Sequence, residues 1–280
     1  MQKRLNEKGH TITYREEGHG PTMILLHGYG GSPYEWDHLV PGLASKYRVI
    51  VPNLTQLFLD PYQRVRFNEQ VDVLSGFIRR ILKDGEQAHL LAASYGGALA
   101  WALSVHDPRT IGRLILLSPM PPNPSSRIRF PNLKRLLWLG QWPRLLWMFL
   151  NTGWGKRQLP DIATHFNVAW LKAKSKRLDE MSPRKVRLIV HVLHRFAWIV
   201  GRERWRYWED RIRFIESPVC IIWGSEDRLY LESEPERLQQ VFPACRLHRI
   251  HGAGHVLAKE SPTQVEAIIE SFFGAERKSA

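Results

Sequence analysis

The spacing of hydrophobic and polar positions along this chain predicts strands and helices in turn. Uninterrupted apolar runs at residues 23–26, 88–92 and 219–223 have the length and composition of buried strands. Apolar residues over 68–83 recur at the three- and four-residue steps of a helix with one buried face. Such alternation predicts a doubly wound, mostly parallel α/β sheet that is covered on both faces.

The expected elements can be ordered along the whole chain. The expected strands are residues 11–16, 23–26, 48–51, 88–92, 113–117, 219–223 and 245–250. The expected helices are residues 33–44, 68–83, 95–106, 132–139, 161–178, 182–200, 202–215, 235–241 and 261–272. Ser32-Pro33 and Ser182-Pro183 suit helix starts, and Gly201 suits a helix end.

The alternation of strands and helices stops at Ser118-Pro119 and resumes near residue 215. Residues 120–214 carry helix signals only, so we expect a helical cap inserted into a core made of residues 1–119 and 215–280. The cap holds 20 of the 40 Lys and Arg, 6 of the 27 Asp and Glu, and eight of the eleven Trp. It is therefore strongly basic and aromatic, whereas the core is nearly neutral.

Composition narrows the class of protein. Two cysteines cannot form a disulfide framework, and the first residues lack the apolar stretch of a secretory signal. No uncharged apolar run reaches the ~18 residues of a membrane span. We expect a cytoplasmic protein, with peripheral membrane association as an open alternative.

Candidate chemistry begins at Ala92-Ala93-Ser94-Tyr95-Gly96-Gly97, between an expected strand and an expected helix. A serine at such a sharp turn presents its hydroxyl, and the turn needs small residues two positions before and after it. Ala92 and Gly96 meet that need. An ordinary strand-to-helix turn is the alternative for this motif taken alone.

Three further motifs follow expected strands. Residues 26–31 read Leu-His-Gly-Tyr-Gly-Gly, residues 222–228 read Ile-Trp-Gly-Ser-Glu-Asp-Arg, and residues 251–255 read His-Gly-Ala-Gly-His. The second motif offers Asp227, with Glu226 in reserve, and the third offers His255, with His251 as a neighbour that ends the strand. A serine, a carboxylate and a histidine in this chain order suit nucleophilic catalysis on an α/β sheet.

Together these motifs resemble the α/β-hydrolase family, in particular its serine esterases and lipases such as monoacylglycerol lipases and lysophospholipases. The resemblance implies Ser94 as nucleophile, His255 as base and Asp227 as the carboxylate that orients it. It implies that the backbone N–H groups of Tyr29 and Tyr95 form an oxyanion hole. Two departures stand out: Ala92 replaces the first glycine of G-x-S-x-G, and residues 52–59 lack the family's Asp-x-x-Gly-x-Gly run.

The second departure bears on the substrate. The resemblance places residues 52–59 beside the site, and we expect Leu57 and Phe58, with His27 and Gly28, to line an apolar substrate pocket. We therefore expect hydrolysis of a carboxylic ester with an apolar acyl or lipid group through an acyl-enzyme, without cofactor or metal. His191 and His194 lack convincing further metal ligands. A thioesterase, a C–C bond hydrolase and a ligand-binding protein of low turnover remain alternatives.

The cap suggests a partner. Lys134, Arg135 and Arg144 alternate with Leu and Trp residues, a pattern typical of helices that lie in a membrane interface. An anionic membrane surface is thus a candidate partner, and packing of the tryptophans onto the core is the alternative. We do not expect nucleic-acid binding.

Overall fold

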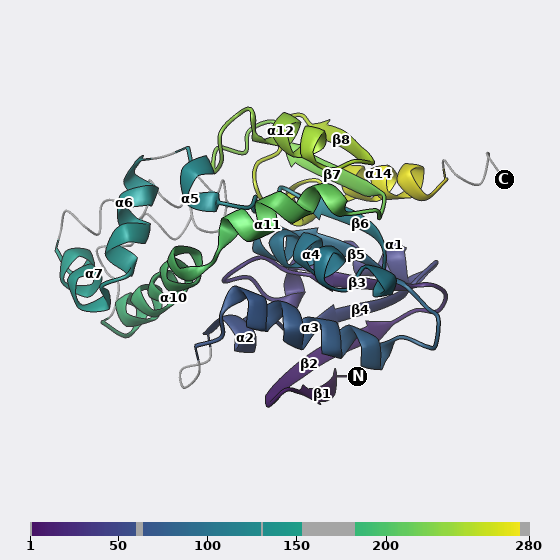
Figure 1. The fold of residues 1–280 in the computed structure, drawn as a ribbon, viewed down its shortest axis with the longest axis horizontal. Coiled ribbons are helices and arrows are strands. Elements are labelled where there is room, and N and C mark those ends of the chain that lie inside the picture. Colours follow the sequence, from purple (N-terminus) through teal and green to yellow (C-terminus); the bar gives the residue numbers. More distant parts are fainter. Residues whose placement is uncertain (1, 60–63, 130, 153–182, 275–280) are drawn as a thin grey trace.

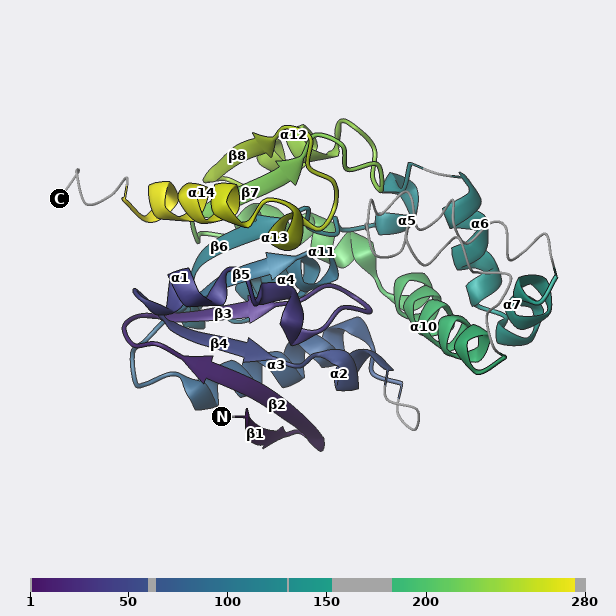
Figure 2. The same cartoon turned by 180° about the vertical axis from the view of Figure 1, so that it is seen from behind.

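A computed structural model describes residues 2–59, 64–129, 131–152 and 183–274 of the chain. Its centre is an open sheet with helices on both faces, and a group of helices extends beyond one end of that sheet (Figures 1 and 2). The expected helix at residues 161–178 lies outside the described residues.

The sheet has eight strands in the order β1-β2-β4-β3-β5-β6-β7-β8. The strands are β1 (Gln2–Glu7), β2 (His10–Glu17), β3 (Thr22–Leu26), β4 (Arg48–Pro52), β5 (Ala88–Ala93), β6 (Ile111–Leu117), β7 (Val219–Gly224) and β8 (Cys245–Ile250). β1, β2 and β4 pair antiparallel, and the remaining pairs are parallel. The expected fold class is confirmed. β1 escapes the sequence analysis because its only large apolar side chain is Leu5, as suits a solvated edge strand.

The helices largely follow the expected order. They are α1 (Val40–Ala44), α2 (Thr55–Leu59), α3 (Phe67–Ile81), α4 (Tyr95–His106), α5 (Pro124–Arg127), α6 (Pro131–Gly140), α7 (Pro143–Leu150), α10 (Pro183–Arg202), α11 (Trp205–Arg211), α12 (Glu234–Val241), α13 (Leu257–Glu260) and α14 (Pro262–Gly274). Short 3₁₀ turns are η1 (Pro33–Trp36), η2 (Pro108–Thr110) and η4 (Ile212–Phe214). The sequence analysis did not predict α2, α5, α7 or α13.

Three expected helices have wrong limits, and one of them, 202–215, is α11 followed by η4. The expected helix 33–44 is divided into η1 and α1, because Pro41 has no N–H to offer the carbonyl of Asp37. Gly201 does not end its helix, since α10 continues to Arg202. Gly201 is not among the glycines with positive φ, so it does not take the left-handed conformation of a helix-ending glycine.

Alternating residues of the central strands supply two apolar layers. In β3, Ile24 and Leu26 face the layer beneath α3 and α4, whereas Met23 and Leu25 face the layer beneath α1 and α14. Figures 1 and 2 show these helices on opposite faces of the sheet. Because both faces are covered, every residue of β3 and β7 is buried.

The inserted segment leaves the sheet after β6 and returns before β7. Its helices α6, α7 and α10 lie beyond the end of the sheet (Figures 1 and 2). α11 differs, because Trp205 and Trp208 stack against Phe67 on the core, with ring centroids 5.1 and 5.6 Å away. None of the described helices is long and apolar enough to cross a bilayer.

Candidate active site

Ser94 lies at the junction of β5 and α4 in a strained backbone conformation. Its φ of +50° and ψ of −116° are values that non-glycine residues rarely adopt. Gly96 permits this turn, since a Cβ there would lie 2.2 Å from the carbonyl oxygen of Leu26. Ala92 is fully buried in the apolar layer beneath α4. The turn therefore needs glycine after Ser94 but accepts alanine before it.

The structure brings Ser94, His255 and Asp227 into one hydrogen-bonded row. His255 Nε2 lies 2.9 Å from Ser94 Oγ, and His255 Nδ1 lies 2.7 Å from Asp227 Oδ2. The other carboxylate oxygen of Asp227 accepts a 3.0 Å hydrogen bond from the Leu229 N–H. The Asp227 carboxylate thereby favours a proton on Nδ1, which leaves Nε2 free to accept the proton of the Ser94 hydroxyl.

Close backbone contact holds the acid and base loops together. A Cβ at Gly224 would lie 2.2 Å from the carbonyl oxygen of Gly254, so only glycine allows this approach. The Ser225 N–H donates to Ile250 O, and the Glu226 N–H donates to Ala253 O, both at 2.9 Å. The side chain of Glu226 is exposed, and Asp227 rather than this reserve candidate contacts His255.

Burial and charge shift the pKa values of this pair in opposite directions. Burial alone would lower the pKa of His255, but Asp227, with Glu35 and Glu260 at longer range, raises it above its usual value. Burial alone would raise the pKa of Asp227, but the imidazole of His255 and the hydrogen bonds it accepts keep the pKa lowered. The pair therefore favours an ionised carboxylate beside an imidazole that readily takes a proton.

His27 fixes the peptide that precedes Tyr29. Its Nδ1 donates to Gly28 O at 2.9 Å, while its Nε2 accepts the N–H of Leu54 at 3.0 Å. The Gly31 N–H also donates to Gly28 O, at 3.1 Å. Because a trans peptide directs its carbonyl and N–H to opposite sides, this anchoring also fixes the direction of the Tyr29 N–H. Burial lowers the pKa of His27 to about 4, so the ring stays neutral.

The two predicted oxyanion donors flank Ser94. A Cβ at Gly28 would lie 3.3 Å from Ser94 Cβ, which places the Gly28–Tyr29 peptide against the nucleophile turn. Tyr95 is the first residue of α4, where an N–H has no acceptor within the helix. Their use in an oxyanion hole stays a prediction.

Leu57 and Phe58, which the sequence suggests for the wall of a substrate pocket, have buried side chains in the structure. They belong to α2, and each is 2% exposed. The Phe58 ring stacks on Tyr29, with centroids 5.2 Å apart, and meets Tyr95 edge-on at 5.0 Å. His27 is fully buried too. In this structure all three side chains support the loops around Ser94, and their contact with a substrate stays a prediction.

The family model described as alpha/beta hydrolase fold matches residues 21–262, and this range contains every residue of the candidate site. The chain belongs to the α/β-hydrolase fold family. This agrees with the resemblance that the motifs carry.

Three proteins illustrate what this α/β-hydrolase is similar to. A monoacylglycerol lipase of Xenopus laevis is 22% identical over 269 residues, covering 92% of this chain and 77% of the relative. A 2-hydroxy-6-oxononadienedioate/2-hydroxy-6-oxononatrienedioate hydrolase of Cupriavidus pinatubonensis is 23% identical over 264 residues, covering 90% and 86%. The crystal structure of a membrane phospholipase A, a bacterial virulence factor, matches with a TM-score of 0.72 at 22% identity, covering 99% and 86%. At this identity the structural match shows the fold alone.

One residue of this α/β-hydrolase site escapes the sequence analysis. Glu35 lies in η1, and its Oε2 accepts the N–H of Gly28 at 3.3 Å. It also interacts electrostatically with His255 and Lys259, and its burial raises its pKa. In the sequence, an acidic residue three positions after Ser32 reads as a helix-capping glutamate, so only the folded loop places it beside the candidate site.

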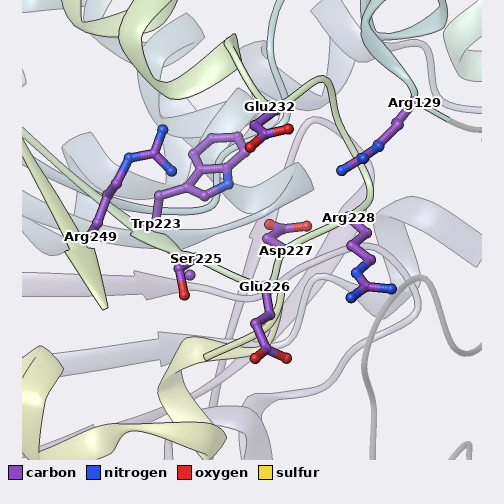
Figure 3. A pocket seen from close by; sticks show the side chains of 9 residues that line it. Arg129, Trp223, Ser225, Glu226, Asp227, Arg228, Glu232 and Arg249 are labelled. Carbon is purple, nitrogen blue, oxygen red and sulfur yellow. The ribbon is translucent and has the colours of Figure 1, made fainter. Parts of the chain in front are cut away.

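A charged hollow lies beside the loop that carries Asp227 (Figure 3). It is lined by Arg129, Arg228, Arg249, Glu226, Glu232 and the Trp223–Asp227 segment, and its lining includes neither Ser94 nor His255. Side chains of both signs surround it, and Arg249 pairs with Glu236. The hollow therefore borders the candidate site at Asp227 and does not reach Ser94 or His255.

No group of three or more His, Cys, Asp or Glu side chains in the described ranges is arranged to hold a metal ion. His194 Nδ1 donates to Gly140 O at 2.6 Å between α10 and α6. It is buried and packs the two helices together.

Proposed function

We propose that this α/β-hydrolase is a serine hydrolase that cleaves carboxylic esters, with Ser94 as nucleophile, His255 as base and Asp227 as the group that orients the base. The row of hydrogen bonds from Ser94 Oγ through His255 to Asp227 carries this proposal. An imidazole within 2.9 Å of a hydroxyl and 2.7 Å of a buried carboxylate meets the geometric needs of a serine nucleophile.

The proposed reaction has two steps. Ser94 Oγ attacks the acyl carbon while His255 Nε2 takes the hydroxyl proton, and the N–H groups of Tyr29 and Tyr95 stabilise the oxyanion. The ester C–O bond then breaks, and the alcohol leaves with the proton from His255. Water attacks the acyl-enzyme in the same manner and releases the carboxylic acid and free Ser94. Asp227 stays ionised and stabilises the imidazolium in both steps.

An apolar acyl group is the proposed substrate class. Around Ser94, one continuous apolar cluster connects the sheet with α2, α7 and α10, and Tyr29 and Phe196 pack against it. Burial of a hydrocarbon chain there would contribute about 0.8 kcal/mol for each methylene group. The names of the lipase and phospholipase among the similar proteins agree with such a substrate. We propose that the substrate is met at a membrane to which the cap attaches peripherally.

C–C bond hydrolysis is the second candidate, and the similarity to the 2-hydroxy-6-oxononadienedioate hydrolase favours it. The same serine and histidine would then cleave the bond beside a ketone instead of an ester bond. A panel of vinylogous diketones beside esters would separate the two activities.

The proposed ester hydrolysis is tested with p-nitrophenyl esters of graded acyl length. We expect the wild type to turn over these esters and to prefer longer acyl chains. Ser94→Ala should lower kcat by at least about a thousandfold. Ser126→Ala, which alters an exposed serine, should keep the wild-type kcat. A fluorophosphonate probe should label the wild type and Ser126→Ala but not Ser94→Ala. Full activity or labelling in Ser94→Ala would falsify the proposal, and an unlabelled wild type would favour a ligand-binding protein.

A further inference from the structure

The cap exposes large apolar side chains on two adjacent helices. On α6, α7 and the turn between them these side chains are 42–61% exposed, and together we call them the cap shelf: Trp138, Trp142, Leu145, Trp147 and Met148. Over the described residues, only three other large apolar side chains are exposed, namely Tyr34, Tyr207 and Phe214. A cluster of this kind on a protein surface marks an interaction site more often than a scatter of single residues does.

Packing among the described cap residues does not account for the shelf. α7 buries Leu146 and Leu150 on its inner side, so the helix already has an apolar face toward the protein. The shelf residues add a second apolar side that faces outward. Pro143, Trp147 and Met148 also line an open groove with Val190 of α10, of about 420 Å³.

The charge around the shelf has one sign. α6, α7 and α10 together contain eight Lys and Arg residues and neither Asp nor Glu. Lys134, Arg135 and Arg144 are exposed beside the shelf. Tryptophan prefers the boundary between water and hydrocarbon, and Lys and Arg nearby attract anionic head groups. An anionic lipid surface satisfies both features.

A second copy of this chain fits the shelf less well. Joining two shelves would bring two clusters of cations together without acidic partners on α6, α7 or α10. Like charges placed opposite each other disfavour association. The observed charge therefore favours a lipid surface over self-association.

The shelf lies at one end of the molecule. Figures 1 and 2 both place α7 at the end opposite the C-terminal helix α14, with α6 and α10 beside it. α10 then connects the shelf with the candidate site: the Tyr29 hydroxyl donates to Val192 O at 3.2 Å, and Tyr29 and Phe196 have ring centroids 4.8 Å apart. Among the described elements, α10 lies between the shelf and the residues next to Ser94.

We infer that the cap shelf docks the protein on the surface of an anionic phospholipid bilayer. Trp142, Trp147 and Met148 insert into the boundary between head groups and acyl chains, and Lys134, Arg135 and Arg144 contact the lipid phosphates. Docking would bring the proposed esterase to its lipid substrate, but the surface itself does not depend on that activity. The two proposals can therefore fail separately.

Flotation with lipid vesicles tests the docking. The full chain is mixed with vesicles of phosphatidylcholine alone or with phosphatidylglycerol, at low salt and at a salt concentration that screens charges over about 8 Å. We expect binding to the anionic vesicles, weakened by salt. Trp142→Ser/Met148→Ser should reduce binding about tenfold or more, since two inserted side chains return to water. Lys134→Glu/Arg144→Glu should reduce it similarly at low salt.

Two control variants make matching changes away from the shelf. Tyr207→Ser/Phe214→Ser removes two exposed aromatic side chains away from the shelf, and Arg109→Glu/Arg246→Glu changes net charge by the same amount at exposed positions. Both controls should bind vesicles as the wild type does. All variants should hydrolyse a water-soluble short-chain ester at the wild-type rate, which separates loss of docking from loss of activity.

Several results would overturn the docking proposal. They are absence of wild-type binding at low salt, equal binding by the shelf and control variants, and equal binding to neutral and anionic vesicles. A wild-type dimer that only the shelf variants convert to a monomer, without vesicle binding, would assign the shelf to self-association instead. If docking is observed but Ser94→Ala does not alter ester hydrolysis, the docking stands and the proposed catalysis fails.

Discussion

The sheet core buries its apolar side chains, whereas the cap helices leave several of theirs exposed. In β3 and β7 every residue is buried, and the strand-to-loop junctions leave no room even for an added Cβ at Gly96 and Gly224. In α7, by contrast, Trp147 and Met148 are 42% and 61% exposed. Both regions are apolar in sequence, but α7 buries only part of its apolar side chains and leaves Trp147 and Met148 outward-facing.

This difference indicates where each region is constrained. The core must place three loops within hydrogen-bond distance of each other, so its tight backbone contacts serve the site. The cap helix α10 contacts the site by way of Val192 and Phe196. We infer that the core determines the chemistry and that the cap determines where the substrate is met.

The largest expected effect comes from the carboxylate. Asp227→Asn should lower kcat by about 10³- to 10⁴-fold, because an amide cannot hold His255 in the tautomer that accepts the Ser94 proton. Glu226→Gln is the matched control and should retain nearly full activity, since its side chain is exposed and has no hydrogen bond to His255. Steady-state kinetics on a soluble ester measure both. A larger loss of kcat in Glu226→Gln than in Asp227→Asn would show that Glu226, and not Asp227, orients His255.

A pair of glycines tests whether the core is packed more strictly than the cap. Gly96→Ala places a Cβ 2.2 Å from a backbone oxygen and should reduce the free energy of unfolding by about 3 kcal/mol. Gly140→Ala places a Cβ 2.8 Å from the Cβ of Ala197. We expect it to reduce the free energy of unfolding by only about 1–2 kcal/mol, because α6 can shift away from α10.

Thermal unfolding measures these costs, and Gly274→Ala, which has nothing within 4 Å of its added Cβ, is the control. For a chain of this size, 1 kcal/mol corresponds to about 2–4 °C in Tm. Equal shifts in Gly96→Ala and Gly140→Ala would remove the distinction between a strict core and an adaptable cap.

The sequence predicts some elements of the core and the site much better than others. β3, β5 and β7 are found because strands buried on both faces read as continuous apolar runs, and the motifs of the site follow such strands. β1 and Glu35 are missed because their placement depends on distant partners, β2 in one case and the Gly28 N–H in the other. Local pattern carries no information about either contact. For the same reason, the sequence shows that Leu57 and Phe58 are apolar but does not show that their side chains are buried in the core.

Glu35 offers a smaller effect within the site. Glu35→Gln removes a negative charge that helps raise the pKa of His255, so that pKa should fall. Since the proposed base acts when neutral, activity is lost as pH falls through this pKa, and the acidic limb of the pH profile should move to lower pH. We expect kcat at neutral pH to fall about threefold to tenfold, because the Gly28 N–H loses a charged acceptor.

The pH profile separates this positioning role from a structural one. Glu232→Gln, which alters an exposed carboxylate on the acid loop, should leave the acidic limb in place. If Glu35→Gln also leaves it in place, Glu35 has no electrostatic influence on His255 under turnover conditions, whatever happens to kcat.

The smallest expected effect comes from two tyrosine hydroxyls that connect the site to its surroundings. Tyr95→Phe leaves the buried Gln70 without its 2.8 Å donor inside the core, so unfolding should become easier by about 1–3 kcal/mol. Tyr29→Phe removes the 3.2 Å hydrogen bond to Val192 O, a carbonyl on α10. This change should lower the free energy of opening the cap, rather than of unfolding the core, by about 0.5–1 kcal/mol. We expect Tyr29→Phe to keep the wild-type Tm but to increase the rate of limited proteolysis within the cap about threefold, since the cap opens without the core. Equal losses of Tm in the two variants, with unchanged proteolysis, would mean that the cap and the core unfold as one unit and that the cap does not open separately over Ser94.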